Sequence, residues 1–587
     1  MNILDVRHSF NGMRWNVKEC DFRLARFLQQ RYQLPEIVAR IMASRNITAE
    51  MAEAFLNPTL KNHLPNPFSL KDMRKAADRM AKAVLDGEPI GLMGDYDVDG
   101  ATSTALLKMF LESCGVQTYC FIPDREDGYG PNADKMKEYR QKGCSVVATL
   151  DCGMTAFEPI NYGTELGLDV LVLDHHDADE TRLPNAYAIV NPKRLDEDVN
   201  HPCRYMAAVG VVFLFVVALN AILRDGGFYQ NKQQPNLIEY LDLVAFGTVC
   251  DVVKLQGVNR LFVKSGLKQM RNGKNLGLRA LAELVNLEEA PEAYHLGYVF
   301  GPRINACGRV GKSDIGMRLL SSKDLLTAKV LAEELEALNT TRREIETAVL
   351  NEAMNQVEAA PITTPFLVVQ GENWHQGVVG IVAGRLKDKY NLPVFALSIE
   401  DDEVKGSSRS VSGVDLGTLV MNAIQLGILS RGGGHPMAAG FSLKRSQLEA
   451  FHQYLAEHIN PQMISSDTSV ISVDGVLSVG ALTDTLMENL ALLAPFGESN
   501  PEPVFVIKDV TVSRTVLLKN GHIGCTLSGR NGQYLNAIAF RAADTPLGQQ
   551  LLTVGDKRIH VLGTLKKDNW KGRSKIQLQI ADAAFAE

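Results

Sequence analysis

Short apolar segments alternate with segments of helical periodicity between Met73 and about Asp174. The apolar segments cover residues 90–93, 118–122, 146–150 and 170–173, and the helical patterns lie at about 74–85, 101–112, 132–141 and 157–163. Apolar strands that alternate with helices are typical of a parallel sheet with helices on both faces. We therefore expect an α/β domain over residues 73–320, with a helical preface over residues 1–72.

The pattern changes at Ser322. The next 39 residues contain neither glycine nor proline, which predicts one long helix within residues 321–360, capped by Ser321 and Asp324. This helix is either an ordinary bundle helix or a spacer that joins two domains across a cleft. Strands and helices alternate again over residues 361–460, and strands dominate residues 469–587. The predicted fold class is α/β: a parallel-sheet domain joined by a long helix to a second α/β domain, followed by an OB-type β-barrel.

Composition sets the cellular context. The longest apolar stretch, at about residues 209–222, is too short to cross a bilayer and predicts a buried helix. Residues 1–20 lack the pattern of a signal peptide, and the nine cysteines form no CxxC pair. We expect a cytoplasmic monomer with reduced thiols and no membrane contact.

Three aspartates, Asp95, Asp97 and Asp99, directly follow the first apolar strand. Packed carboxylates repel one another unless a cation neutralises them, and oxygen ligands favour hard divalent cations. An EF-hand is excluded because its twelfth position would be Leu106, where a glutamate is required. Two alternatives to a metal loop remain open: a haloacid-dehalogenase loop with Asp97 as nucleophile and Asp99 as acid, or simple capping of the next helix by Asp99.

Acidic residues and histidines also end later segments. Asp151 follows the third strand, Asp174, His175 and His176 follow the fourth, and Asp251 follows an apolar helix. Ligands bind at the carboxyl ends of parallel strands, so we expect these groups to converge. A set made mostly of aspartates suits two Mn²⁺ or Mg²⁺ ions better than zinc, and two such ions are suited to hydrolysing phosphate esters.

These motifs, in this order, resemble the four motifs of the DHH phosphoesterase superfamily. Residues 431–440, Arg-Gly-Gly-Gly-His-Pro-Met-Ala-Ala-Gly, resemble its DHH-associated C-terminal module. With the barrel added, the resemblance extends over residues 70–585 and implies a 5′→3′ exonuclease specific for single-stranded DNA, which releases mononucleotides and acts in DNA repair and recombination.

The resemblance also implies roles for individual residues. The expected metal ligands are Asp95, Asp97, Asp99, Asp151, His175 and Asp251. The expected catalytic set contains the same residues without Asp95 and with His176. Asp151 would bridge the two ions. Asp174 would orient His175, and His176 would contact the phosphate.

Three further segments are candidates for phosphate contacts. Arg303, Asn305 and Arg309 lie among small residues, and arginine binds phosphate in a bidentate manner. By resemblance, Arg125 with Ser407 and Arg409 would hold a 5′-phosphate, and Gly433, Gly434 and His435 would contact the DNA. The alternatives are structural ion pairs for the arginines, a polar strand end at Ser407, and an ordinary turn at the glycine run.

The C-terminal module is basic although the whole chain has a net charge of −7. Residues 503–587 contain 12 Lys+Arg and 6 Asp+Glu, so this part carries +6 and the remainder −13. Lys567, Lys571 and Arg573 surround Trp570 in a predicted hairpin, which suits phosphate contacts and base stacking. A solvated strand surface and a packing role for Trp570 are the alternatives. The resemblance further implies a contact between the barrel and single-stranded DNA-binding protein, with a helicase acting upstream.

Three functions compete at this point. The first is the exonuclease described above. The second is a DHH phosphodiesterase of short oligonucleotides or cyclic dinucleotides, but such relatives generally lack the basic barrel. The third is a non-catalytic scaffold, for which the acidic motifs should be eroded, and all four are intact here.

Overall fold

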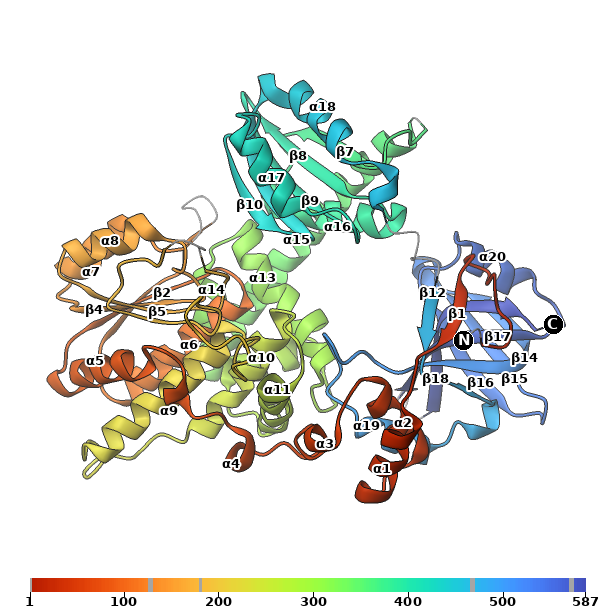
Figure 1. Ribbon diagram of the computed structural model, residues 1–587, viewed down its shortest axis with the longest axis horizontal. Coiled ribbons are helices and arrows are strands. Elements are labelled where there is room, and N and C mark those ends of the chain that lie inside the picture. The colour runs from red at the N-terminus through yellow and green to blue at the C-terminus, as the bar shows by residue number, and fades with distance from the viewer. Residues whose placement is uncertain are drawn as a thin grey trace.

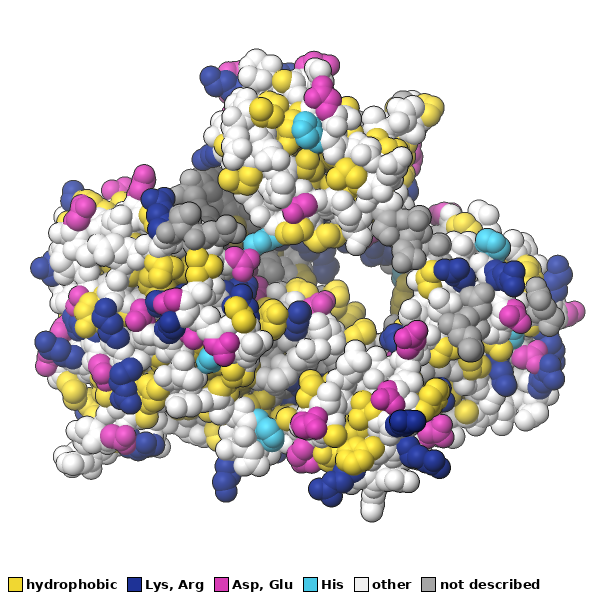
Figure 2. All heavy atoms as spheres, in the orientation of Figure 1, with side chains coloured by type: hydrophobic (Ala, Val, Ile, Leu, Met, Phe, Trp, Pro, Cys, Tyr) yellow, Lys and Arg dark blue, Asp and Glu magenta, His cyan; other side chains and the backbone are white. Residues whose placement is uncertain are grey.

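The computed structural model describes residues 3–124, 130–178, 182–359, 361–464, 470–568 and 575–586. The chain folds into three bodies that surround an opening (Figure 1, Figure 2). A first α/β domain lies at the left of Figure 1 and a second α/β domain at the top. The third body, at the right, contains both ends of the chain.

Five parallel strands form the sheet of the first domain, in the order β3-β2-β4-β5-β6. They are β2 (Ile90–Gly94), β3 (Thr118–Phe121), β4 (Val146–Leu150), β5 (Asp169–Leu173) and β6 (Ala188–Val190). Helices α7 (Ala133–Gln141) and α8 (Phe157–Glu165) cover one face, and α5 (Met73–Asp86), α6 (Val98–Ser113) and α9 (Ala208–Asp225) cover the other (Figure 1). The prediction of a parallel sheet covered on both faces is confirmed, although the short strand β6 was not anticipated.

A layer of helices completes the first domain. Its members are η2 (Leu237–Tyr240), α10 (Leu241–Cys250), α11 (Gly257–Met270), α12 (Leu276–Leu284), the π-helix η3 (His295–Phe300), α13 (Gly301–Val310) and α14 (Asp314–Leu320). Helix α9 is long and apolar enough to cross a membrane by length and composition, but 72% of it is buried inside the protein. The prediction of a buried helix in this region is therefore confirmed.

Helix α15 (Leu325–Glu358) has 34 residues and connects the two α/β domains. At 1.5 Å per residue it is about 50 Å long. Its N-cap is Asp324, whose carboxylate accepts a hydrogen bond from the Thr327 N–H at 2.8 Å. The predicted pairing of Ser321 with Asp324 is wrong, because the Ser321 hydroxyl donates to the carbonyl of Met317 instead.

The second α/β domain contains a mixed five-stranded sheet in the order β10-β11-β9-β8-β7. The strands are β7 (Leu367–Glu372), β8 (Val394–Glu400), β9 (Glu403–Arg409), β10 (Arg431–His435) and β11 (Ala438–Lys444). Three helices pack on them: α16 (Gln376–Tyr390), α17 (Leu416–Gln425) and α18 (Leu448–His458), with the 3-10 turns η4 (Arg445–Gln447) and η5 (Pro461–Met463) beside α18.

The C-terminal strands form a closed barrel, as predicted. Neighbouring pairs run β14-β15-β16-β18-β17, and β17 pairs again with β14 to close the circle. The strands are β14 (Val504–Leu517), β15 (Ile523–Ser528), β16 (Tyr534–Ala539), β17 (Ile559–Asp568) and β18 (Lys575–Phe585), with β13 (Gly475–Leu477) added beside β14. Helices α19 (Asp484–Ala491) and α20 (Pro546–Thr553) and the 3-10 turns η7 (Val479–Ala481) and η8 (Lys519–Gly521) complete the module.

The N-terminal region packs on this barrel. Its helical elements are α1 (Phe22–Tyr32), α2 (Glu36–Ser44), α3 (Ala49–Leu56), α4 (Leu60–His63) and η1 (Pro67–Ser69). The region predicted as a helical preface also contains a strand, β1 (Arg14–Val17), which pairs in parallel with β12 (Val470–Val473). The indole of Trp15, fully buried, donates to the carboxylate of Asp582 at 3.0 Å, and one apolar core joins the α1–α3 helices to the barrel. The two ends of the chain thus build one folded body.

A buried arginine connects this terminal body to the first domain. Arg260 of α11 is 1% exposed, and its guanidinium donates to the carbonyls of Phe55, Ala494, Leu493 and Pro495 at 2.8, 2.7, 3.1 and 3.4 Å. The same guanidinium lies 3.7 Å from the centre of the Phe55 ring. We call this contact the Arg260 junction; it fixes the terminal body against the first domain.

Candidate metal centre

The aspartate loop lies between β2 and α6. Asp97 is the N-cap of α6, and its Oδ1 accepts hydrogen bonds from the N–H groups of Asp99 at 2.9 Å and Gly100 at 3.0 Å. Position 100 must be glycine, because a Cβ there would lie 2.4 Å from the carbonyl oxygen of Asp95. The helix cap is therefore Asp97, and the alternative that Asp99 caps this helix is wrong.

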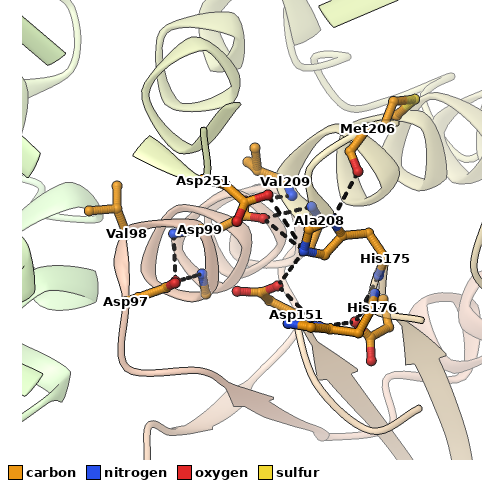
Figure 3. A network of polar contacts seen from close by, with 12 residues as sticks. Asp97, Val98, Asp99, Asp151, His175, His176, Met206, Ala208, Val209 and Asp251 are labelled. Carbon is orange, nitrogen blue, oxygen red and sulfur yellow. Dashed lines mark hydrogen bonds and ion pairs between the residues drawn. The ribbon is translucent and has the colours of Figure 1, made fainter. Parts of the chain in front are cut away.

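Asp99 is held from a different element. Its two carboxylate oxygens accept hydrogen bonds from the N–H groups of Ala208 at 2.7 Å and Val209 at 2.9 Å, which are the first residues of α9 (Figure 3). The N-terminus of a helix favours a negative charge, so α9 both orients and partly stabilises this carboxylate. Asp99 is 1% exposed.

Asp151 and Asp251 complete the acidic cluster. Asp151 follows β4 in a left-handed conformation with φ of 61°, and it is 2% exposed. Asp251 is the C-cap of α10. Burial, followed by the repulsion of the neighbouring aspartates, raises the pKa of Asp151 well above its usual range, that of Asp251 to about 9 and that of Asp99 to about 7.

The imidazole of His175 faces these carboxylates. Its Nδ1 contacts the carbonyl of Met206 at 3.0 Å, and burial lowers its pKa to about 3, so the ring is neutral and Nδ1 carries the proton. The Nε2 atom lies 3.4 Å from Asp151 Oδ1, 3.5 Å from Asp251 Oδ2 and 3.9 Å from Asp99 Oδ2 (Figure 3). A lone pair that faces three carboxylate oxygens is repelled unless a cation lies between them. These donors therefore fit a divalent cation with oxygen and imidazole ligands.

Asp174 organises the neighbouring histidine. Its Oδ1 accepts from the His176 ring at 2.8 Å and from the backbone N–H groups of His175 and His176, and its Oδ2 accepts from the N–H of Met154. Burial opposes a charge on His176, but the hydrogen bond to Asp174 outweighs it and raises the His176 pKa to about 9. The expectation that Asp174 orients the ring of His175 is wrong: it orients His176, and the Met206 carbonyl orients His175.

Three sets of side chains could each hold a cation, with their ligand atoms within 4.8 Å of one another. They are Asp95, Asp97 and Asp151; Asp99, His175 and Asp251; and Asp151, His175 and His176. All six expected metal ligands therefore converge at one place. Asp151 belongs to two of the sets, together with carboxylates on one side and histidines on the other.

The residues of α13 are less available to a phosphate than the sequence suggested. Arg303 is 9% exposed, forms an ion pair with Glu336 of α15 at 2.5 Å and donates to the Val299 carbonyl, so the alternative of a structural ion pair describes it better than a phosphate ligand. Asn305 accepts a hydrogen bond from the N–H of Val98 at 3.2 Å and so supports the aspartate loop. Arg309 donates to the carbonyl of Gly377 and joins α13 to α16 of the second domain.

The second domain contributes Arg409 and the glycine strand. Arg409 donates to the carbonyl of Ser408 at 2.8 Å and to the hydroxyl of Ser407 at 3.4 Å, and burial lowers its pKa. Gly433, Gly434 and His435 do not form a turn; they lie in the exposed edge strand β10. The Nδ1 atom of His435 lies 3.9 Å from Oδ2 of Asp177, so β10 contacts the segment that follows His175 and His176.

The remaining predicted DNA contacts are Arg125 and four residues of the C-terminal module. Lys567 of β17 forms an ion pair with Asp484 at 3.2 Å. Arg125, Trp570, Lys571 and Arg573 lie outside the described residues.

Sequence reasoning missed several groups that build the site. The carbonyl of Met206 and the first N–H groups of α9 act through the backbone, where side-chain identity gives no signal. Asn191, directly after β6, donates from its amide to the carbonyl of His176 at 2.8 Å. Recognition of β6 as a fifth strand would have placed this residue at the same edge of the sheet.

Comparison with known proteins agrees with this geometry. Family profiles match the DHH family N-terminal domain over residues 89–248, the DHHA1 domain over 363–460 and the RecJ OB domain over 473–582. The single-stranded-DNA-specific exonuclease RecJ of Bacillus subtilis (strain 168) is 34% identical over 584 residues, covering 98% of this chain and 71% of that protein. RecJ of Escherichia coli (strain K12) is 36% identical over 490 residues, covering 81% of this chain and 83% of that protein.

Two solved structures of RecJ proteins are similar to this chain. The crystal structure of RecJ in complex with Mn²⁺ from Thermus thermophilus is similar with a TM-score of 0.80 and 29% sequence identity, covering 98% of this chain and 80% of that chain. A second crystal structure, of exonuclease RecJ bound to manganese, is 32% identical with a TM-score of 0.58 and covers 68% of this chain and 98% of that chain. The chain belongs to the RecJ family of single-stranded-DNA-specific exonucleases.

Proposed function

We propose that this protein hydrolyses single-stranded DNA from the 5′ end, releases mononucleotides and uses two divalent cations, Mn²⁺ or Mg²⁺. The observation that carries the proposal is the neutral His175 Nε2 opposite three buried carboxylate oxygens. Crystal structures of RecJ from Thermus thermophilus in complex with Mn²⁺ and with Mg²⁺ support the choice of metal. By analogy with its relatives, the protein would act in DNA repair and recombination.

The proposed ligands divide between two ions. Asp95 and Asp97 would hold one ion, and Asp99, His175 and Asp251 the other. Asp151 would bridge them, because it shares one set with Asp95 and Asp97 and another with His175. The bound ions would supply a hydroxide nucleophile at neutral pH and neutralise charge on the phosphoryl oxygens.

The chain's own groups would orient the substrate. His176 is half-buried and, with a pKa near 9, is protonated at neutral pH, so it would donate from Nε2 to a phosphate oxygen. Asp174 holds this imidazolium in place from behind. The helix cap at Asp97 and the contacts of Asp99 with α9 keep these carboxylates fixed while the substrate moves.

Arg409 is our candidate for the group that would set the direction of digestion. Among the described residues no carboxylate forms an ion pair with Arg409, although this arginine is buried deeply enough for its pKa to fall. A Cβ at Gly380 of α16 would lie 2.8 Å from the Ser407 hydroxyl and 3.3 Å from Arg409 Nη2, so the glycine keeps the helix close to these groups. A terminal phosphate carries more charge than an internal diester and suits such a group, and by the resemblance to the family we assign Ser407 and Arg409 to the phosphate at the 5′ end.

The cellular context is part of the same proposal. A monomer in the cytoplasm would receive single strands from a helicase and contact single-stranded DNA-binding protein through the barrel. These assignments rest on the resemblance to the family and on the basic charge of residues 503–587.

The decisive experiment follows the ends of the substrate. The protein is incubated with Mn²⁺ and single strands labelled at the 5′ or the 3′ end, in parallel with blunt duplex and with dinucleotides. We expect the 5′ label to appear at once in mononucleotides while the 3′ label remains in long products. Early release of the 3′ label would reverse the proposed direction. Preferential hydrolysis of dinucleotides would instead favour a phosphodiesterase of short substrates, and no hydrolysis with intact metal binding would favour a scaffold.

A further inference from the structure

Two exposed tyrosines stand side by side near the metal centre. Tyr294 and Tyr298 are 54% and 74% exposed, and their rings stack with centroids 5.3 Å apart and an angle of 26° between the planes. Leu296 and Phe300 of the same segment are buried and pack into the core of the first domain. The core therefore does not require the tyrosine side chains, which remain exposed to solvent. We call this pair the tyrosine platform.

The tyrosine platform lies at an irregular segment of helix. Residues His295–Phe300 form a π-helix that runs directly into α13, and Tyr294 is its N-cap. Such wide turns cost stability relative to a regular α-helix and occur frequently at functional sites. Positions four apart lie on one face of a helix, which brings the two rings together.

The π-helix packs against the C-terminal end of α10, next to the metal centre. The thiol of Cys250 donates to the carbonyl of Leu296 at 3.3 Å, and Cys250 directly precedes the candidate ligand Asp251. A Cβ at Gly301 would lie 2.7 Å from the sulfur of Cys250, and one at Gly297 would lie 3.5 Å from Val249. The platform is thus packed against the end of α10 that delivers a ligand.

The platform also reaches the barrel. Lys566 of β17 lies with its Nζ 6.0 Å from the centre of the Tyr294 ring, and it forms an ion pair with Glu502. The tyrosines therefore lie where the first domain meets the terminal body, between the barrel and the carboxylate cluster. Figure 2 shows hydrophobic side chains on the rim of the opening that separates these bodies.

From these contacts we propose that Tyr294 and Tyr298 stack against unpaired bases of the single strand on its way from the barrel to the metal centre. The proposal rests on the proposed function and adds a base-binding subsite to it. Aromatic side chains bind every base through its flat face, and a nearby lysine suits the phosphates between them. Paired bases inside a duplex cannot present that face, so the platform would also contribute to selection of single strands.

The first test compares variants of the full-length protein by fluorescence anisotropy, with labelled oligo(dT) and without a metal that supports cleavage. We expect Tyr298→Ala to weaken binding about tenfold, the effect of one lost stack, and Tyr298→Phe to retain most of the affinity. The matched control is Phe22→Ala, because Phe22 belongs to α1, is 68% exposed and, like Tyr294 of the platform, lies beneath a cation, Arg40 at 5.6 Å. Unchanged binding by Tyr298→Ala, or an equal loss in Phe22→Ala, overturns the proposal.

The second test changes the DNA. Oligo(dT) strands with one abasic site at successive positions are bound to the wild-type protein and to Tyr298→Ala. We expect one position at which base removal weakens wild-type binding but adds nothing to the loss in the variant. If no position weakens wild-type binding, the platform does not stack on bases, whatever the stability of the variant. This readout needs no hydrolysis, so it is separate from a failure of the proposed exonuclease activity, which the end-labelling experiment detects.

Discussion

The metal centre and the Arg260 junction both bury charge of one sign, yet their surroundings differ. At the metal centre Asp99, Asp151 and Asp251 point their oxygens at one another and at a neutral His175. At the junction the guanidinium of Arg260 donates to four backbone carbonyls, and burial lowers its pKa to about 9. One site leaves repulsion that a cation must relieve, whereas the other is satisfied within the chain.

The difference separates a binding site from a structural contact better than burial does. Arg260 and Asp99 are each 1% exposed, so burial alone cannot distinguish them. What distinguishes them is the direction of the polar atoms: donors meet acceptors at Arg260, and acceptors meet acceptors around His175 Nε2. Buried groups that cannot satisfy one another indicate a ligand.

The largest expected effect is on catalysis. Asp151→Asn keeps the shape of the side chain, and asparagine tolerates the left-handed backbone at this position. We expect the initial rate on single-stranded DNA with Mn²⁺ to fall on the order of 10³-fold or more. The free energy of unfolding in EDTA should stay the same or rise, because burial and the neighbouring aspartates disfavour a charged carboxylate here and asparagine carries no charge. The control Asp388→Asn changes a carboxylate that is 70% exposed and should keep the wild-type rate. An Asp151→Asn protein with normal activity would refute the assignment of the centre.

Substitution at the Arg260 junction should lower the stability of the protein. Arg260→Met leaves buried carbonyls of Phe55 and residues 493–495 without donors, so we expect a loss of about 3 kcal/mol or more in the free energy of unfolding, measured with urea. Arg260→Lys should lose less, because an ammonium group still offers three donors. Equal stability of Arg260→Met and the wild type would mean that the junction contributes nothing to holding the terminal body.

Added metal should stabilise the folded protein through the metal centre and not through the Arg260 junction. A ligand at 100 times its Kd stabilises the folded state by about 2.7 kcal/mol, so Mn²⁺ should raise the melting temperature and EDTA should reverse the rise. Arg260→Lys should melt earlier but show the same increment with Mn²⁺, whereas Asp151→Asn should lose the increment. If Mn²⁺ raised the melting temperature of both variants by the same amount, the contrast between the metal centre and the Arg260 junction would be refuted.

The smallest effect concerns a buried carboxyl outside the cluster. Burial raises the pKa of Asp242 in α10 to about 7 from an ordinary value of 3.8. The folded state therefore binds a proton more tightly than the unfolded state, and stability falls as pH rises between these two values. Asp242→Asn should be more stable than the wild type by about 1–3 kcal/mol at pH 8, with a smaller difference near pH 5. Urea titrations at both pH values measure this; a difference that does not depend on pH would contradict the assigned cause.

The sequence predicted those parts of the molecule in which local pattern and tertiary packing agree. The four longer strands of the first sheet follow from apolar runs, and three of these runs, in β2, β4 and β5, lead directly into the acids of the cluster. Strand β6 has three residues, too few for its pattern to stand out. Side-chain partners were harder to predict: whether Asp174 binds the ring of His175 or of His176 depends on the turn after β5, and sequence order does not encode it.

Arginines in α13 illustrate a second limit. Arg303 and Arg309 share a helix rich in small residues, but one meets Glu336 of α15 and the other reaches Gly377 of the second domain. Both partners are distant in sequence, so the local pattern could not distinguish a phosphate ligand from a structural contact. The same reason explains β1, a short segment that becomes a strand only because β12 lies beside it.

The pairing of the two chain ends has a consequence for biosynthesis. Trp15 and its partner Asp582 are 567 residues apart, and ribosomes add about 5–20 residues per second, so roughly half a minute to two minutes separate their synthesis. During that time the apolar faces of α1–α3 have no barrel to cover them. The nascent chain must therefore be protected from aggregation until the strands of the barrel have been synthesised, and a ribosome that stalls before β17 and β18 would release a protein with a complete metal centre and an N-terminal region that lacks its partner.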